Sequence, residues 1–196
     1  MGKGAWLRLS ALVLAASVSG GCTAAVPHQT HQLAPVRPTT GASASGPIGS
    51  PGHPLSLGCA EQAISAGPAQ LPGGNDLVIG PLDIVNGRLL PTASPAGWGD
   101  NGSYKIPVAV APYGTVTVVI AARARGYVAI DNPYGPPGGV AAATYHSCQG
   151  AWTVFAQGFV FRGGRIRGCV PLDVQVAGQP QAHQVTLSLF AGSCPA

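Results

Sequence analysis

The stretch Thr115-Val116-Thr117-Val118-Val119-Ile120 is the clearest indication of the fold class. Its first four residues alternate between threonine and valine, the period-2 pattern of a strand with one face in the core. The preceding Pro112-Tyr113-Gly114 is a typical turn sequence. The segment is therefore predicted to be a half-buried β-strand that follows a tight turn.

Further short strands are predicted on both sides of this one, among them residues 104–111 and 152–161. No segment from Leu57 onward has a sustained 3.6-residue apolar period, and Gly- and Pro-rich turns separate the apolar runs. About nine short strands with such spacing are typical of an all-β antiparallel sandwich or barrel. We favour an Ig-like β-sandwich, because the strand lengths are uneven and two cross-links would suit that packing.

Composition and charge exclude some classes of protein. Only 8% of the 196 residues are charged, whereas 46% are hydrophobic and 29 are glycine, which favours an exported β-protein over a helical cytoplasmic enzyme. The formal charge is +4, but Lys3 and Arg8 lie at the extreme N-terminus. From Leu57 onward there are seven basic and six acidic residues, so no basic surface for nucleic acid is predicted.

The N-terminus has the order of a secretory signal. Lys3 and Arg8 precede an apolar run at residues 11–18, and small residues then lead to Cys22. The run is shorter than the ~20 residues needed to cross a bilayer. Residues 1–21 are therefore predicted to be a signal peptide.

The residues around Cys22 resemble the lipobox of bacterial lipoproteins. Small residues stand directly before the cysteine, although Ser19 occupies the position where that family usually has leucine. The resemblance implies that Cys22 becomes a lipidated N-terminus that anchors the chain at the outer face of the cell membrane. The alternative is ordinary secretion, with cleavage near Ala24 and loss of Cys22.

The rest of the chain is predicted to form a tether and one domain. Residues 22–56 are rich in Pro, Gly and Ser and contain no acidic residue, so they cannot bury enough apolar area to offset the entropy of ordering. Residues 57–196 are predicted to be the β-sandwich domain.

The cysteines beyond Cys22 predict two disulfides, because an even number in an exported chain is typical of a disulfide framework. Four cysteines allow three connectivities. We favour Cys148–Cys169 within the sheet and Cys59–Cys194 between the ends of the domain. No Cys-x-x-Cys pair is present and no histidine lies at ligand spacing from a cysteine, so no metal site is predicted.

Two similar tetrapeptides invite a functional interpretation. Pro81-Leu82-Asp83-Ile84 and Pro171-Leu172-Asp173-Val174 could supply paired carboxylates for acid–base work or cation binding. We favour the simpler interpretation that each begins a strand with its aspartate facing outward. The usual motifs of nucleophilic, zinc and phosphate-binding sites are absent from the sequence, and His146 and His183 have no visible partner.

The loop Asp131–Gly139 is the best candidate for recognition, because exported β-sandwiches tend to present function on loops. Its candidate residues are Asp131, Asn132 and Tyr134. A second candidate is an anion-binding patch of arginines around Gly163-Gly164, but the sequence there is also typical of a two-residue hairpin with solvated arginines. We favour the hairpin.

Several segments resemble a family of exported proteins from high-GC Gram-positive bacteria. The resemblance implies export and paired cysteines, and it implies no activity or mechanism. The segments are Gly80-Pro81-Leu82-Asp83-Ile84, Asp131-Asn132-Pro133, residues 168–174 and residues 185–194.

These observations lead us to expect a monomeric cell-envelope lipoprotein that acts as a non-enzymatic binding or structural module. Its partners would be the membrane, through the lipid, and an envelope ligand or protein. We expect no catalytic residue, cofactor, metal or nucleic acid. One alternative is a hydrolase of envelope polymers that uses Asp83, Asp131 or Asp173, and another is a secreted enzyme inhibitor that presents the loop Asp131–Gly139.

Overall fold

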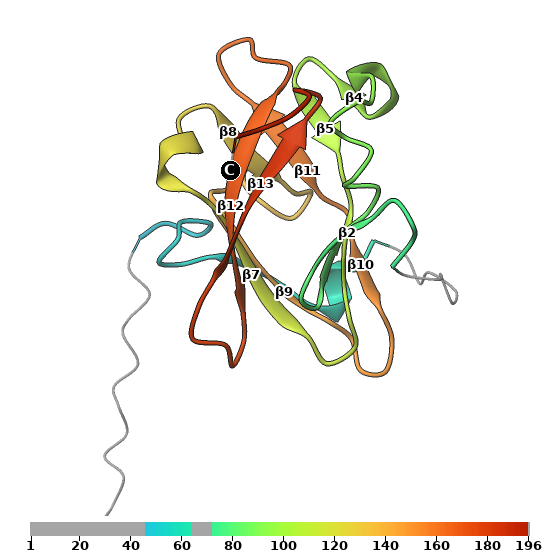
Figure 1. Cartoon of the computed structure of the whole chain (residues 1–196). Coiled ribbons are helices and arrows are strands. Elements are labelled where there is room, and N and C mark those ends of the chain that lie inside the picture. Colours follow the sequence, from blue (N-terminus) through green and yellow to red (C-terminus); the bar gives the residue numbers. More distant parts are fainter. Residues whose placement is uncertain (1–45, 64–71, 196) are drawn as a thin grey trace, which may run out of the picture. The chain divides into compact units, whose positions relative to one another are not determined.

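The computed structural model describes residues 46–63 and 72–195 (Figure 1). Cys22, the predicted signal peptide and most of the predicted tether lie outside these residues. The described part contains thirteen strands and three short 3-10 helices, so the all-β prediction is confirmed with more strands than expected. Within the same residues, no helix has the length and apolar composition to cross a bilayer.

The strands form three sheets. All pairings are antiparallel except that of β1 with β9, which is parallel. The first sheet has the order β1 (Leu55–Leu57), β9 (Ala142–His146), β7 (Thr115–Ile120), β12 (Gly168–Val176) and β13 (His183–Leu189). The second has the order β10 (Thr153–Phe155), β6 (Val108–Val110), β3 (Leu82–Ile84) and β2 (Leu77–Ile79). The third has the order β4 (Gly99–Asp100), β5 (Ser103–Lys105), β11 (Gly158–Phe161) and β8 (Val128–Asp131).

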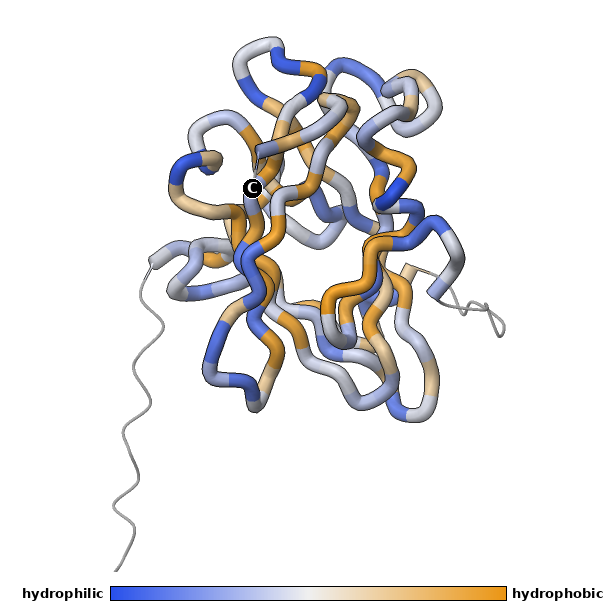
Figure 2. The backbone as a smooth tube through the Cα atoms, viewed as in Figure 1, coloured by the Kyte–Doolittle hydropathy of each residue, from blue (hydrophilic) through white to orange (hydrophobic). Residues whose placement is uncertain are grey.

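Strand β7 has the alternation that its sequence predicts. Val116, Val118 and Ile120 are buried, whereas Thr117 faces the other way and hydrogen-bonds Thr144 at 2.8 Å between the hydroxyls. The buried apolar side chains of the sheets form one continuous core. Figure 2 shows the same division, with apolar residues along the strands and polar residues at many of the turns.

Two of the predicted strands are each divided between two sheets. Residues 104–111 become β5 and β6, and residues 152–161 become β10 and β11. Pro107 has no N–H to donate to a ladder. Ile106 N donates to Gln157 O at 2.9 Å, so residues 104–111 and 152–161 bend at the same place. Strands that pass between sheets through such bends make a corner. This corner places the candidate site.

Ordered structure begins earlier than residue 57. Leu55 and Leu57 are buried, and the strand that contains them pairs with β9. Further upstream, Gly49 O accepts hydrogen bonds from Ala141 N and Ala142 N at 2.9 and 2.8 Å. The end of the predicted tether therefore belongs to the domain, because Leu55 there gains from burial in the core.

The favoured disulfide pairing was wrong. The bonds join Cys59 to Cys148 and Cys169 to Cys194, with Cα–Cα distances of 5.4 and 5.7 Å. Leu57 pairs with Tyr145 in parallel, so the residues that follow them leave the sheet at the same end. This brings Cys59 and Cys148 together. The presence of two disulfides indicates an oxidising environment.

The turn at Gly163-Gly164 is not a β-hairpin. It connects β11 in the third sheet to β12 in the first, so the flanking segments do not pair. Two of its arginines contact other parts of the domain. Arg162 Nη2 donates to Gly138 O at 3.0 Å, and the Arg165 guanidinium lies 4.9 Å from the ring centre of Tyr127. These contacts fix the turn and two of its charges.

A candidate binding recess at the sheet corner

A recess of about 440 Å³ opens where the two divided strands change sheets. It lies between the end of β5, the start of β6, the end of β8 and the bend between β10 and β11. Its walls include Lys105, Pro107, Asp131, Asn132, Gln157 and Gly158. The volume is within the range of small-ligand sites.

Two of the three predicted recognition residues, Asp131 and Asn132, lie in this recess. Asn132 is 5% exposed and both ends of its amide are used. Its Nδ2 donates to Ala156 O at 3.1 Å, and its Oδ1 accepts from Tyr134 N at 2.9 Å, which is an Asx-turn. Tyr134 itself lies outside the recess lining and is 53% exposed.

Asp131 and Lys105 stand on either side of Gly158. Gly158 pairs with Lys105 on β5 and with Asp131 on β8, so these three residues form one row across the sheet. Asp131 Oδ2 accepts a hydrogen bond from Ser103 Oγ at 3.1 Å, whereas Lys105 is exposed. A carboxylate and an ammonium group are therefore available at the two ends of a row whose middle position has no side chain.

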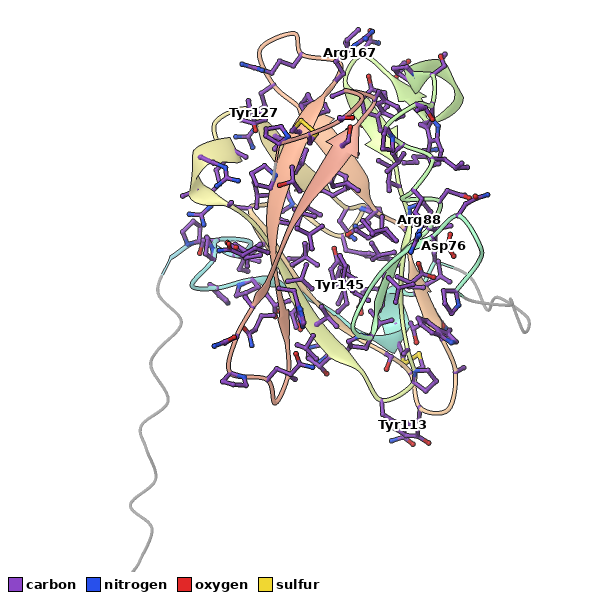
Figure 3. The ribbon with its side chains drawn as sticks, viewed as in Figure 1. Asp76, Arg88, Tyr113, Tyr127, Tyr145 and Arg167 are labelled. Carbon is purple, nitrogen blue, oxygen red and sulfur yellow. A yellow bond between two sulfur atoms is a disulfide. The ribbon has the colours of Figure 1, made fainter. Side chains whose placement is uncertain are left out.

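Gln157 is a recess residue that no sequence motif marks as a candidate. It is 5% exposed, and its Oε1 accepts a hydrogen bond from the buried hydroxyl of Tyr145. Burial raises the pKa of Tyr145, so its hydroxyl remains a donor. Figure 3 shows Tyr145 in the interior of the domain, from where it supports the recess wall.

The loop that follows Asp131 is exposed and held by hydrogen bonds. Gly135 N donates to Asn132 O at 2.9 Å, and Gly139 N donates to Pro136 O at 3.1 Å. Arg162, described above, fixes the carbonyl of Gly138. The loop therefore forms two consecutive tight turns beside the recess.

Asp83 does not face outward as predicted. It is fully buried in β3, and neither of its oxygens has a hydrogen-bond partner among the described residues. Burial, together with the nearby carboxylate of Asp76, raises its pKa to about 7. Asp76, by contrast, accepts hydrogen bonds from Gly73 N and Asn86 N. The Asp76–Asp83 pair is buried and therefore closed to substrate.

The three acids proposed for a hydrolase do not come together. Asp83 lies in the second sheet, Asp131 in the third and Asp173 in the first. Asp173 is half-buried on the outer face of β12, between Val119 and Gln184. Within the described ranges, no three His, Cys, Asp or Glu residues lie close enough together to hold a metal ion.

His146 has partners that the sequence did not reveal. Its Nε2 lies 3.2 Å from Ser56 Oγ, and its Nδ1 lies 3.2 Å from Thr115 Oγ1. All three residues are on one face of neighbouring strands, and Ser56 and His146 are exposed. A threonine cannot stabilise an imidazolium as a carboxylate does, so we interpret this group as cross-strand hydrogen bonding.

No protein-family profile matches this chain, and neither a curated protein nor a solved structure is significantly similar to it. The function of the recess therefore has to follow from its own geometry and chemistry.

Proposed function

We propose that this protein is an exported, lipid-anchored envelope protein whose domain binds a ligand without chemical conversion, in the recess at the sheet corner. The observation that supports this most is the meeting of Asp131 and Asn132 with Lys105 and Gln157 around one recess of about 440 Å³. The signal pattern and Cys22 support export and anchoring. The two disulfides agree with an exported location.

A second recess, beside β12 and β13, is the natural comparison. It has about 520 Å³ and is also lined by one basic and one acidic residue, Arg123 and Asp173. The corner recess, however, has two polar side chains in its wall, Asn132 and Gln157, that are each 5% exposed and held by hydrogen bonds. Buried and oriented polar groups of this kind favour the corner as the binding site, because they select a ligand without reorganising.

The inhibitor alternative has one supporting observation, which is that Pro133, Tyr134, Pro136 and Pro137 are exposed. The hydrogen bond from Gly135 N to Asn132 O, however, makes the segment around Tyr134 a tight turn. Peptides that add to a sheet edge bind in an extended conformation. The recess therefore supports the proposal better than the loop tip does.

The test is capture of envelope components by the immobilised purified protein. The double variant Lys105→Met/Asp131→Asn removes both charges of the corner recess, and Arg123→Met/Asp173→Asn is its control, with the same net change of charge in the other recess. We expect the first variant to lose a component that the wild type and the control retain. Identical capture by all three proteins would contradict a binding role for the corner recess.

The variant Tyr134→Ala separates the two candidate surfaces. It removes the exposed ring at the loop tip and leaves the recess walls intact, because Asn132 Oδ1 accepts from the backbone N of residue 134. Capture that depends on Tyr134 and not on Lys105 or Asp131 would favour the inhibitor alternative.

A further inference from the structure

The floor of the corner recess is bare backbone. In the row Lys105–Gly158–Asp131, paired residues project from the same face of the sheet, so the side chains of Lys105 and Asp131 stand on either side of Gly158. With adjacent strands about 4.7–4.9 Å apart, the two flanking backbones are separated by roughly 10 Å.

Gly158 cannot be replaced by a larger residue without moving the backbone. A Cβ atom at this position would collide with the carbonyl oxygen of Tyr104 on β5. Glycine within a strand often marks a place where a ligand or another chain approaches the backbone closely. The close contact between β5 and β11 therefore excludes any side chain of β11 from the middle of the row.

The carboxylate of Asp131 is held over this floor. Its hydrogen-bond donor, Ser103, belongs to β5, so the Asp131 side chain leans across β11 to reach it. No donor among the described residues hydrogen-bonds the second oxygen, Oδ1. That oxygen is left as an acceptor for a cationic or N–H group of a ligand.

Lys105 and Gln157 supply hydrogen-bond donors to the same recess. Lys105 is exposed and has three N–H donors on a flexible stem. Gln157 uses its Oε1 for Tyr145, and its Nε2 donates to no described residue while the side chain lines the recess. Pro107, Ala156 and Pro133 provide the apolar part of the recess wall.

From this arrangement we infer that the recess takes a small zwitterionic ligand of the amino-acid or dipeptide class, with its ammonium group on Asp131 and its carboxylate toward Lys105. The inference rests on the proposed binding function and adds the chemical class of the ligand. A ligand with both charges satisfies both ends of the row, whereas a ligand with one charge leaves the other end of the row unpaired.

The experiment is a titration of the ¹⁵N-labelled purified protein with a panel of free dipeptides and with their N-acetylated and C-amidated forms, followed by amide chemical shifts. We expect shifts centred on Gly158, Asn132 and Gln157, and affinity about tenfold or more lower for either capped form, since a hydrogen bond to a charged group contributes about 1.5–3 kcal/mol.

Two single variants assign the ends of the ligand. Lys105→Met should no longer distinguish a free carboxylate from an amide, and Asp131→Asn should no longer distinguish a free amine from an N-acetyl group. Arg123→Met and Asp173→Asn should keep both preferences. Each variant's amide spectrum without ligand reports whether it is folded.

The outcomes separate the inference from the function on which it rests. Equal affinity for free and capped dipeptides, or no shifts from any of them, overturns the zwitterion inference. If envelope capture still depends on Lys105 and Asp131 in that case, the binding function stands with another ligand class. If capture is also unaffected by the recess variants, both fail.

Discussion

The tetrapeptides Pro81-Leu82-Asp83-Ile84 and Pro171-Leu172-Asp173-Val174 have nearly the same sequence but different surroundings. Both lie largely in strands, β3 and β12, and both bury the leucine and the residue after the aspartate. Asp83 is fully buried beside Asp76, whereas Asp173 is half-buried on the outer face of its sheet. The alternation of a strand decides which side a residue faces, but it does not decide what covers that side.

The difference has an energetic consequence. A carboxyl group that is buried without a partner favours its neutral form, so the folded state holds the proton of Asp83 more tightly than the unfolded chain does. With a folded pKa of about 7 and an ordinary value of 3.8, its contribution to stability is fully present below about pH 4 and is lost as the pH rises through 7.

The largest effects on stability are expected from the two disulfides, one of which holds β12 and neither of which holds β3. Cys169 stands two residues before Pro171, and its bond to Cys194 closes 25 residues, whereas Cys59–Cys148 closes 89. In the chain-entropy picture, Cys59→Ala/Cys148→Ala should lower the free energy of unfolding by about 4.5 kcal/mol, and Cys169→Ala/Cys194→Ala by about 3.5 kcal/mol. Urea denaturation measures both.

The order of the two disulfide variants is what tests the loop-length argument. A smaller loss for Cys59→Ala/Cys148→Ala than for the other variant would contradict it. Non-reducing peptide mapping of the wild type provides the control, because it should give only the two linkages named above.

Asp83→Asn should come next in size and should have the opposite sign. At pH 8 it removes an ionised buried carboxylate and supplies an amide that can donate to Asp76, so we expect the free energy of unfolding to rise by roughly 2–4 kcal/mol. At pH 4 the wild-type group is protonated and the two proteins should be nearly equal. Denaturation across pH 4–8 is the measurement, and parallel pH profiles for the two proteins would refute the assignment.

Tyr145→Phe tests a buried polar group that does have a partner. The substitution leaves Oε1 of the buried Gln157 without its donor, so we expect a loss of about 1–2 kcal/mol of stability. Tyr113→Phe is the matched control, because Tyr113 is 78% exposed at the turn before β7 (Figure 3) and should change stability little. Equal effects of the two substitutions would show that the hydrogen bond inside the recess wall contributes nothing.

Asp173→Asn should have the smallest effect, within about 0.5 kcal/mol at pH 8, because substitutions on an outer face rarely exceed that. It is the direct counterpart of Asp83→Asn, and thermal unfolding of both variants at pH 8 is sufficient to compare them. A stabilisation of Asp173→Asn similar to that of Asp83→Asn would remove the contrast between the two strands.

Part of the candidate site could be predicted from the sequence. Asp131 and Asn132 stood out because a turn-rich loop follows a strand, and both line the recess. Lys105 and Gln157 did not stand out, because they join the site only through the pairing of β5 with β11 and the shared bend beside it. Gly158 did not stand out either. A side chain is excluded at this position by the carbonyl oxygen of Tyr104, which is distant in sequence.

The sequence by itself determined the all-β class and the inward residues of β7, because these depend on period-2 patterning and on local turn residues. The tertiary structure decided the disulfide pairing, the division of two strands at the corner, the burial of Asp83 and the row across Gly158. Each of these depends on which strands become neighbours, and strand neighbours are chosen by the packing of the whole core, a non-local property that no short segment contains.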